Sequence, residues 1–567
     1  MTLKKILVTA SLLVAPVFLV GQGRGLDPAT LLKPLAEEWP TYNGDYSGKR
    51  FSALTQINRG TVKNLTLAWS LRLTGGSVPG AAGFGGGRGG GGGGGGAANL
   101  IIGGEGTGDY PVGPPVIKAS ALMVDGTIYL TAPDNGWAID ARDGRVLWHY
   151  FWKTRGGTHI ATRGFGMWKD YLYMETPDNY LVSLEARTEK ERWHKVISDF
   201  NQQYFSTMAP IVAGNHVLAG TGNDLDMPGF LQSFDPETGD LQWKLYTVPM
   251  NEGDPGLESW PSLDAARHGG AQPWLPGAYD PETRLYIFGT GNPTPAYTPG
   301  RGDESHDNLF TGSLIAVNVD TGKMAWYYQT APHDMHDWDS AQTPVIVDAP
   351  FKGRMRKLVM TAARNGYFFV LDRVTGEHLL TSKYGSTTNW VKHLDEKGRP
   401  KRNPEKDPTV GGSIVSPSAG GTVNWEPPAF SPETGLFYVG ENNVYSIFYL
   451  IDTDPRGSMG LGGKLETRIG TGGSFLTALD YKTGKAAWRF KYEGGAGGGG
   501  GVLATAGKLV FAGDGAGNIV AHDAYTGKPL WHSKVGNVTN PPQTYMLDGR
   551  QYLIVGTGDT LWAFYLY

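Results

Sequence analysis

The chain has no cysteine among its 567 residues. This absence excludes a disulfide framework, thiolate metal sites, a catalytic cysteine and a covalently attached c-type haem. An excess of charge of one sign is also lacking, since the formal net charge is −4. The chain therefore has no electrostatic signature of binding to nucleic acid or to an anionic membrane surface, and we expect no nucleic-acid partner.

Long hydrophobic runs are absent after the N-terminus. There, Lys4 and Lys5 precede an apolar run from Ile6 to Val20. A basic start followed by a short apolar run is typical of a secretory signal peptide. We therefore predict a signal peptide at residues 1–25 and a periplasmic or secreted protein. An uncleaved membrane anchor is the alternative, although the run is short for spanning a bilayer.

Glycine and tryptophan, in contrast, are abundant, with 84 and 17 residues. Many of them belong to an eleven-residue phrase that has two strand-like halves, an Asp or Asn, a Thr-Gly or Asp-Gly turn and a final Trp. Gly supplies the positive φ that such a turn needs, and the Asp can bond the turn backbone. Strong copies occupy Ala138–Trp148, Ser233–Trp243, Ala316–Trp326, Ala478–Trp488 and Ala521–Trp531, and weaker copies occupy Ser183–Trp193 and Val370–Leu380.

Strand-rich repeats spaced roughly 40–50 residues apart indicate a β-propeller rather than a helical solenoid. We predict an all-β fold, an eight-bladed β-propeller with tryptophan-docking repeats, over residues 26–567. The count adds to the repeats a strand pair ending at Trp69 and a strand unit at Ala429–Gly440. The C-terminal strands would complete a blade begun elsewhere and close the ring. Glycine dominates residues 75–96, which we interpret as a flexible insertion.

The segment Pro332–Asp339 reads PHDMHDWD and concentrates three carboxylates and two imidazoles in eight residues. One interpretation is a transition-metal site that uses His333 and His336. Another is a solvated acidic loop. The third is a catalytic carboxylate beside a hard, oxygen-preferring cation such as Ca²⁺.

Four further polar segments lie between strands, and glycine in them allows the backbone to approach a ligand closely. Arg in two of these segments offers a planar fork for carboxylates. On one face of a ring they would form a funnel lined by acids and arginines. These segments are Ala161–Gly164, Gly220–Leu231, Gly289–Pro295 and Ala362–Gly366.

The repeats, the opening WPTYNGD and the order of these segments resemble the pyrroloquinoline-quinone (PQQ)-dependent dehydrogenases, a family of alcohol and sugar dehydrogenases built on an eight-bladed propeller. The resemblance implies PQQ and Ca²⁺ as cofactors, with a lanthanide as the other cation. It implies that Asp337 is the catalytic base and that the metal ligands are Asp224, Asn292, Asp337 and Asp339. It implies that the cofactor is contacted by Arg163, Thr207, Thr221, Trp274, Arg364, Asn442 and Phe511.

The chain departs from the family pattern at several positions. Gly157-Thr158 stands where many alcohol-oxidising members have adjacent cysteines, and Lys118 stands at the usual Glu or Gln. Asp339 is similar to the extra acid of lanthanide-using members. The repeated tryptophans we assign to structure.

The resemblance implies oxidation of an alcohol, or of a sugar or polyol, to the carbonyl. Because the chain has no haem-attachment motif, electrons would leave to a separate acceptor such as a c-type cytochrome or a quinone. Two alternatives stay open at this point. One is a non-catalytic scaffold of the cell envelope, and the other is a propeller hydrolase or lyase that uses a transition metal.

Overall fold

The computed structural model describes residues 25–74, 105–106, 115–157, 159, 161–296, 299–451, 464–493 and 499–567. Residues 1–24 of the predicted signal peptide and the predicted insertion at 75–96 lie outside this part of the chain. Within it, no helix has both the length and the apolar character needed to cross a membrane.

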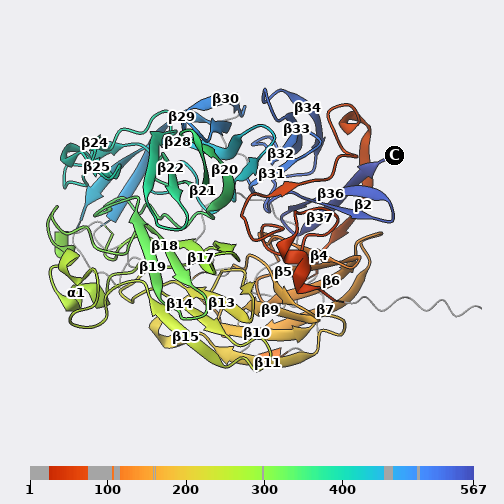
Figure 1. Cartoon of the computed structure of the whole chain (residues 1–567), viewed down its shortest axis with the longest axis horizontal. Helices are drawn as coiled ribbons and strands as arrows, with labels where there is room; N and C mark the ends of the chain where they lie inside the picture. The colour runs from red at the N-terminus through yellow and green to blue at the C-terminus, as the bar shows by residue number, and fades with distance from the viewer. Residues whose placement is uncertain are drawn as a thin grey trace, which may run out of the picture.

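Antiparallel sheets follow one another around a ring (Figure 1). The described residues contain eight sheets of four or five strands and one two-stranded ribbon. In the sheet β12–β15, for example, the residues of the first three strands are buried, whereas those of the last strand, β15, are exposed or half-buried. Apolar clusters fill the space between neighbouring sheets. The predicted all-β propeller is confirmed.

The first half of the chain contains β1 (Phe51–Ser52), β2 (Leu65–Arg72), β3 (Glu105–Gly106), β4 (Leu122–Val124), β5 (Thr127–Ala132), β6 (Asn135–Asp140), β7 (Val146–Lys153), β8 (Gly166–Trp168), β9 (Tyr171–Glu175), β10 (Tyr180–Glu185), β11 (Glu191–Val196), β12 (Ile211–Ala213), β13 (His216–Thr221), β14 (Phe230–Phe234), β15 (Leu241–Tyr246), β16 (Ala278–Asp280) and β17 (Leu285–Gly289). The second half contains β18 (Ser313–Asn318), β19 (Met324–Gln329), β20 (Val345–Phe351), β21 (Arg354–Ala362), β22 (Tyr367–Asp372), β23 (His378–Lys383), β24 (Val391–Leu394), β25 (Pro400–Arg402), β26 (Ser413–Val415), β27 (Ala429–Ser431), β28 (Leu436–Leu450), β29 (Lys464–Asp480), β30 (Ala486–Lys491), β31 (Val502–Thr505), β32 (Leu509–Gly513), β33 (Asn518–Asp523), β34 (Pro529–Lys534), β35 (Gln543–Leu547), β36 (Arg550–Thr557) and β37 (Thr560–Leu566). The described helices are short: α1 (Leu263–Arg267) and the 3-10 helices Pro28–Leu32, Val62–Asn64, Phe200–Gln202, Leu257–Ser259, Pro299–Arg301 and Pro404–Lys406.

Each copy of the eleven-residue phrase forms the hairpin between the third and fourth strands of a sheet. In Trp193, Trp243, Trp326 and Trp488 the final indole docks on a glycine of a neighbouring turn. Trp326 shows the arrangement: its indole nitrogen donates to the Arg373 carbonyl at 3.1 Å. A Cβ added to Gly376, in the turn of the next copy, would lie 2.8 Å from the Trp326 ring. The Gly is therefore needed twice, for its positive φ of 74° and for the space under the indole.

One sheet has no such hairpin, because its strands come from the two ends of the chain. β2 pairs antiparallel with β37, and β35 and β36 complete the sheet. This confirms that the C-terminal strands close the ring. It also corrects two details of the predicted count. The strand with Trp69 pairs with the C-terminal strand rather than with a neighbour, and residues 429–440 (β27 and the start of β28) belong to the sheet of the Ala478–Trp488 copy.

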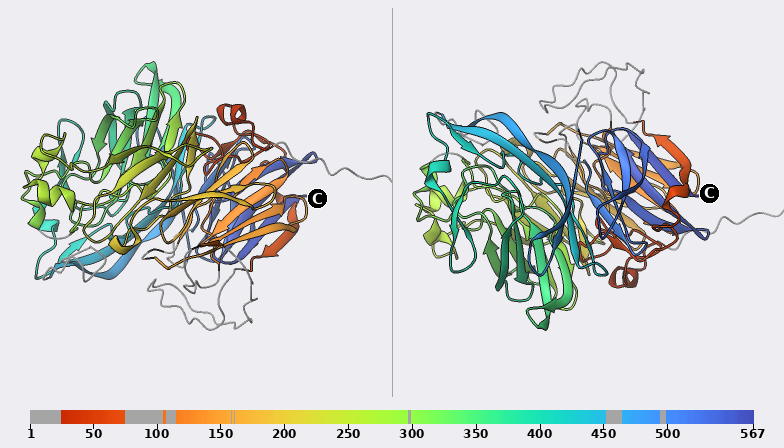
Figure 2. Two further views of the ribbon diagram at one scale, coloured as in Figure 1. Left: turned by 90° about the horizontal axis from the view of Figure 1, so that it is seen from below. Right: turned by 90° about the horizontal axis from the view of Figure 1, so that it is seen from above.

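The segment from Glu37 to Ser52 runs across the ring and bonds to one sheet after another. Its backbone carbonyls accept from Met546, Met123, Tyr279, Ile346, Phe430 and Ala504. Arg50 is fully buried at its centre and donates to the carbonyls of Tyr42, Val502 and Pro542. Figure 2 shows the start of the described chain, in red, on one side of the ring.

Candidate active site

A cavity of about 340 Å³ gathers most of the predicted site residues. It is lined by Lys118, His159, Ala161, Arg163, Phe205, Thr207, Asp224, Gln272, Trp274, Asn292, Asp337, Asp339, Arg364, Asn424 and Trp425. The topology explains why residues so distant in sequence meet. Asp224, Asn292 and Arg364 follow the second strands of their sheets, and the other predicted residues precede first strands. In an antiparallel four-stranded sheet, these two loops leave the same end.

Asp339 is the centre of the polar network in this cavity. One of its oxygens accepts from the Asn292 backbone N–H at 2.6 Å, and the other accepts from the Trp274 indole at 3.0 Å and from Arg364 Nη1. Burial raises the pKa of Asp339 to about 7, while Arg364 opposes the rise and Asp337 adds to it. A carboxylate held this way can exchange its proton for a cation.

Asp337 lies beside this network. Its Oδ2 is 3.9 Å from Arg364 Nη2, and the residue is only 9% exposed. Its backbone has φ 66°, in the left-handed region that residues other than Gly seldom adopt. Such a conformation persists where the surroundings fix it, and it often marks a functional constraint.

Arg163 occupies the other side of the cavity, among aromatic rings. Its guanidinium carbon lies 4.7 Å from the centre of the Trp274 ring and 5.8 Å from that of Trp425. It donates to the Thr207 carbonyl at 3.0 Å, while its Nε has no hydrogen-bond partner among the described residues. Burial lowers the pKa of Arg163 to about 10, and burial followed by the charge of Arg163 also lowers the pKa of Lys118. This end of the cavity is cationic and favours an anionic ligand.

The two histidines of the PHDMHDWD segment do not line the cavity. His333 Nδ1 donates to the His306 carbonyl at 2.6 Å, and His336 Nε2 donates to the Lys406 carbonyl at 2.8 Å while its ring stacks on Trp338. Burial is the main reason that the pKa of each falls to about 3. Both imidazoles are therefore neutral and structural, which contradicts the transition-metal interpretation. The solvated-loop interpretation is also wrong, because the segment is buried.

Among the described residues, no three His, Asp or Glu side chains form a ready-made metal site. Asp224 instead pairs with a histidine: its Oδ2 accepts from His159 Nε2 at 2.8 Å. The four predicted metal ligands nevertheless line one cavity, and their oxygens are the donors that Ca²⁺ and similar hard cations prefer. Cation binding by Asp224, Asn292, Asp337 and Asp339 remains a prediction.

Three predicted cofactor contacts do not line the cavity. Thr221 is fully buried at the end of β13, Phe511 is 1% exposed within an apolar cluster, and Asn442 is a residue of β28. Five further residues line the cavity and were not predicted from the sequence: His159, Phe205, Gln272, Asn424 and Trp425. An Asn-Trp pair directly before the strand at residues 429–431 was the available signal for two of them.

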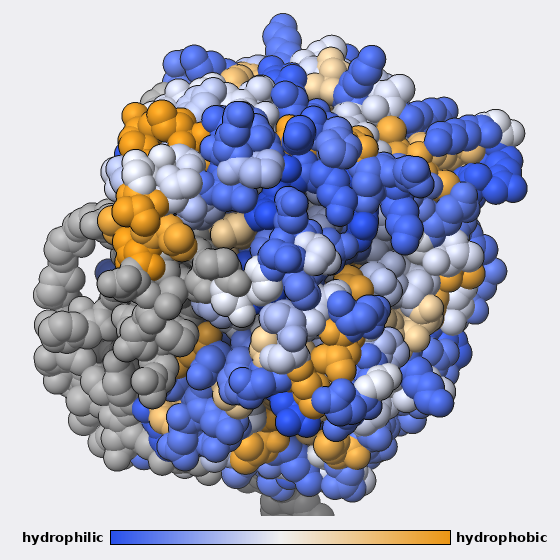
Figure 3. All heavy atoms as spheres, turned by 90° about the vertical axis from the view of Figure 1, so that its left-hand side faces the viewer, coloured by the Kyte–Doolittle hydropathy of each residue, from blue (hydrophilic) through white to orange (hydrophobic). Residues whose placement is uncertain are grey.

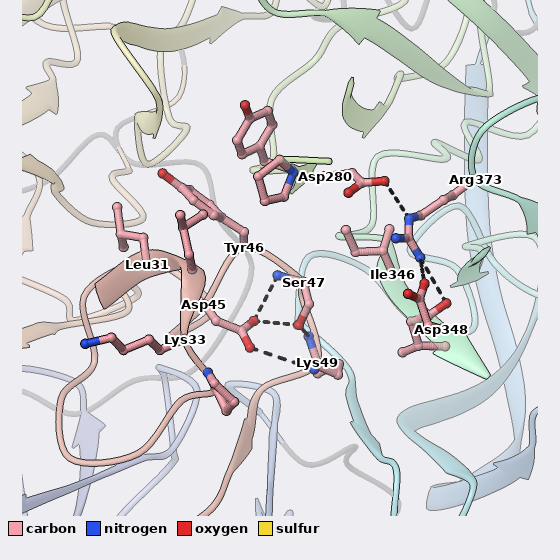
Figure 4. Close-up of a pocket in the computed structure, with 15 residues that line it drawn as sticks. Leu31, Lys33, Asp45, Tyr46, Ser47, Lys49, Asp280, Ile346, Asp348 and Arg373 are labelled. Atoms are coloured by element: carbon pink, nitrogen blue, oxygen red, sulfur yellow. Dashed lines mark hydrogen bonds and ion pairs between the residues drawn. The ribbon is translucent and has the colours of Figure 1, made fainter. Parts of the chain in front are cut away.

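A second, more open groove of about 420 Å³ lies where the N-terminal segment crosses β16 and β20 (Figure 4). Most of its charged groups bind one another: Arg373 contacts Asp280 at 2.7 Å and also Asp348, and Lys49 lies 4.0 Å from Asp45. These ion pairs lower the capacity of the groove for a charged ligand.

The sequence profile of the glucose/ethanol/alcohol dehydrogenase β-propeller domain, named for PQQ, matches residues 39–384. A second profile, described as outer membrane protein assembly factor BamB, matches residues 472–565. Quinohemoprotein alcohol dehydrogenase ADH IIB of Pseudomonas putida is 32% identical over 94% of this chain and 75% of its own length. Quinoprotein alcohol dehydrogenase PedH of Pseudomonas putida is 34% identical over 78% of each chain.

Solved structures of related dehydrogenases have the same fold as this chain. Quinohemoprotein alcohol dehydrogenase from Comamonas testosteroni matches with a TM-score of 0.81 at 28% identity, over 95% of this chain and 82% of that one. A europium-containing methanol dehydrogenase matches with a TM-score of 0.77 at 26% identity, over 94% and 91%. The fold and these relatives define a quinoprotein propeller. The chain belongs to the PQQ-dependent alcohol dehydrogenase family and is an oxidoreductase, which confirms the predicted resemblance.

Proposed function

We propose that this protein oxidises an alcohol to the carbonyl compound in the cavity around Asp337, with PQQ and a hard cation as cofactors. The observation that carries the proposal is one cavity that combines Asp337 and Asp339 with Arg364, Arg163 and Trp274. A cationic, aromatic end beside an acidic end fits a flat polycarboxylate that is bound together with a cation.

The donor set of the cavity fits the quinone. PQQ is planar and carries three carboxylates, so indole faces and guanidinium forks suit it. Arg163 and Lys118 would hold its carboxylates, and Trp274 would cover one face. The unpaired, buried Nε of Arg163 is a donor available for this purpose.

The acidic end fits the cation. Asp224, Asn292 and Asp339 would supply oxygen ligands, with Asp337 next to them. When bound, the quinone supplies the two-electron acceptor and the cation polarises its carbonyl. Whether the cation is Ca²⁺ or a lanthanide depends on the number of carboxylates that turn towards it.

Asp337 would act as the general base. Its carboxylate would accept the hydroxyl proton of the alcohol, while the carbon-bound hydrogen would leave with its electron pair to the two-electron acceptor. Arg364 Nη2, 3.9 Å from Oδ2 of Asp337, forms an ion pair with it. Burial of the loop keeps the base away from bulk water.

Electrons would then pass to a separate acceptor, such as a c-type cytochrome or a quinone. We also propose that the protein is exported, on the basis of the basic and apolar N-terminal sequence. The predicted sugar or polyol substrates remain the second substrate class.

The direct test is reconstitution of the purified apo-protein with PQQ plus Ca²⁺ or La³⁺, followed by a dye-linked assay with alcohols and aldoses. We expect turnover of alcohols that requires both the quinone and one of the cations. Quinone binding is measured separately, by absorbance. Binding without turnover of any alcohol would contradict the proposal, and turnover of aldoses alone would favour the second substrate class.

A further inference from the structure

Glu175 is a buried acid that the proposed chemistry does not use. On the face of the molecule in Figure 3 hydrophilic residues predominate, as expected where charged groups meet water. Glu175, the last residue of β9, is in contrast fully buried, and Arg163 of the active-site cavity is only 6% exposed. Because a buried charge is costly unless other groups compensate it, both side chains need compensating partners inside the protein.

The partners of Glu175 are two backbone N–H groups of the next sheet. Its Oε2 accepts from Met208 at 2.9 Å, and its Oε1 accepts from Gly220 at 3.3 Å. An acid that accepts at both oxygens shows the pattern of an ionised carboxylate. The two bonds fix the segments that lead directly to Thr207 and Asp224, which line the cavity.

The peptide group between Thr207 and Met208 connects Glu175 to Arg163. Its N–H donates to Glu175 Oε2, and its C=O accepts from Arg163 Nη1 at 3.0 Å. Because a trans peptide group is planar, its N–H and C=O point in opposite directions, so the acid and the guanidinium lie on opposite sides of one peptide. Hydrogen bonds in such a chain strengthen one another in the protein interior. The acid therefore fixes the orientation of the carbonyl that Arg163 uses.

The charges of the two residues also act on each other. Burial raises the pKa of Glu175, and its two backbone donors and the positive charge of Arg163 oppose the rise. Burial lowers the pKa of Arg163, and Tyr42 followed by Glu175 opposes that fall. Glu175 and Arg163 therefore favour each other's ionised forms.

We propose that Glu175 is a positioning residue of the active site, which holds the guanidinium of Arg163 in place through the Thr207–Met208 peptide group. Glu175 is not among the residues that line the cavity, so it acts through Arg163. The consequence for the cofactor rests on the proposed function, in which Arg163 binds the quinone carboxylates. A guanidinium that is ordered before the quinone arrives loses less free energy on binding.

The acceptor and the charge of Glu175 have opposite expected effects on the quinone. As an acceptor, the side chain orders Arg163 and strengthens binding. As a negative charge behind Arg163, it would weaken the binding of an anionic ligand. The substitutions E175M and E175Q separate the two effects, because Met removes the acceptors and the charge whereas Gln removes the charge and keeps one acceptor.

The apo-protein tests the link between the two residues without any cofactor. E175M keeps the length of the side chain but removes both acceptors, and R163M removes the guanidinium. We expect the double variant to lower the thermal midpoint Tm by clearly less than the sum of the two single shifts, because both substitutions break the same chain of hydrogen bonds. Additive shifts in Tm would overturn the proposal.

Quinone binding, followed by absorbance, tests the consequence for the cofactor. We expect E175M to bind PQQ about tenfold more weakly than the unmodified protein. E175Q should bind at least as tightly as the unmodified protein, since its amide oxygen can still accept from Met208. An E175Q variant as weak as E175M would overturn the role of the peptide group.

The matched control is Q551M. Gln551 is 2% exposed, its Oε1 accepts from the backbone N–H of Ile57 at 2.8 Å, and neither residue lines the cavity. Q551M therefore also removes the acceptor of a buried N–H group, and it should lower Tm without weakening quinone binding. Equal losses of quinone affinity in Q551M and E175M would reduce the effect of Glu175 to general stability and overturn the proposal.

The two measurements separate this inference from the proposed function. Coupled shifts in Tm in a protein that binds no quinone would support the positioning role and contradict the proposed function. Equally tight quinone binding by E175M and the unmodified protein would overturn the positioning role and leave the proposed function standing.

Discussion

Arg364 lies between two carboxylates, and its Nη2 is 3.9 Å from Oδ2 of Asp337. Asn at position 337 keeps the size and polarity of the side chain but removes its basicity. We expect D337N to lower kcat by about 10²- to 10⁴-fold, the usual contribution of a general base, with quinone binding and thermal stability nearly unchanged. Steady-state kinetics, quinone absorbance and thermal unfolding test these three expectations.

Asp334 is the matched control in the same loop. Its carboxylate accepts from the backbone N–H groups of His336 at 3.1 Å and Trp338 at 2.8 Å, so its role is to hold the loop. We expect D334N to lose stability before it loses activity per folded molecule. A D337N enzyme that turns over normally would remove Asp337 from the role of base.

Cation binding should depend on pH through Asp339. Because its folded pKa is raised from 3.8 to about 7, the folded protein holds this proton between these values while the unfolded chain has lost it. Stability of the apo-protein from this group is therefore present at low pH and is lost as pH rises towards 7. A cation must displace the proton, so we expect affinity for Ca²⁺ or La³⁺ to increase with pH up to about 7.

Calorimetric titration of the apo-protein with each cation measures this dependence. In D339N the increase should flatten, and the loss of affinity should be larger for La³⁺, because a trivalent ion depends more on each negative ligand. An unchanged pH profile in D339N would show that Asp339 is not a ligand.

Two glycines allow a test of how much the packing of Trp on a turn glycine contributes to stability. Gly376 and Gly353 have similar positive φ values, 74° and 81°, but a Cβ at 376 would meet the Trp326 ring at 2.8 Å and a Cβ at 353 would meet nothing within 4 Å. We expect G353A to cost about 1 kcal/mol from backbone strain alone. G376A should cost about 1 to 3 kcal/mol more through overpacking, and chemical denaturation of both variants measures the difference.

His522 should make the propeller sensitive to acid. Its Nδ1 donates to the Gly527 carbonyl at 2.9 Å and its buried Nε2 has no partner in the described structure. Burial lowers its pKa from 6.5 to about 4, so the unfolded chain binds a proton between these values and the folded protein does not. Stability from this group therefore falls as pH drops below 6.5, by about 2 kcal/mol at pH 5.

The variant H522N, whose amide can replace the Nδ1 donor, isolates this contribution. We expect unfolding free energies at pH 5 and pH 7 to differ less in H522N than in the unmodified protein. Equal differences would assign the acid sensitivity to other groups.

The repeats were predictable from the sequence because their Gly and Trp residues serve two purposes. The Gly allows the positive φ of the turn, and it also leaves space for the Trp of a neighbouring repeat. Trp326 and Gly376 meet in the same way as Trp243 and Gly322, so one observation explains several positions. The acids and arginines of the cavity were predictable because they stand in loops between recognisable strands.

The differences between the predicted contacts and the lining of the cavity have physical causes too. Asn442 was expected at the cofactor, but β28 continues to Leu450 and makes Asn442 part of a hairpin, while Asn424 in the preceding loop lines the cavity. Phe511 is apolar and lies in a strand, and nothing in its sequence neighbourhood distinguishes a core residue from one that faces a ligand. His159 stands beside the expected positions, and only the fold brings it to Asp224.

The pairing of β2 with β37 joins the two ends of the chain. The carbonyls of Glu37 and Arg50, which accept from residues 546 and 504, do the same, and these contacts constrain the order of folding. The N-terminal residues can form these contacts only after the C-terminal strands have been synthesised. Such distant pairings slow folding. The ring should therefore close late and cooperatively. Deletion of the last strand, β37, should leave β2 without its partner and both ends of the chain unpaired.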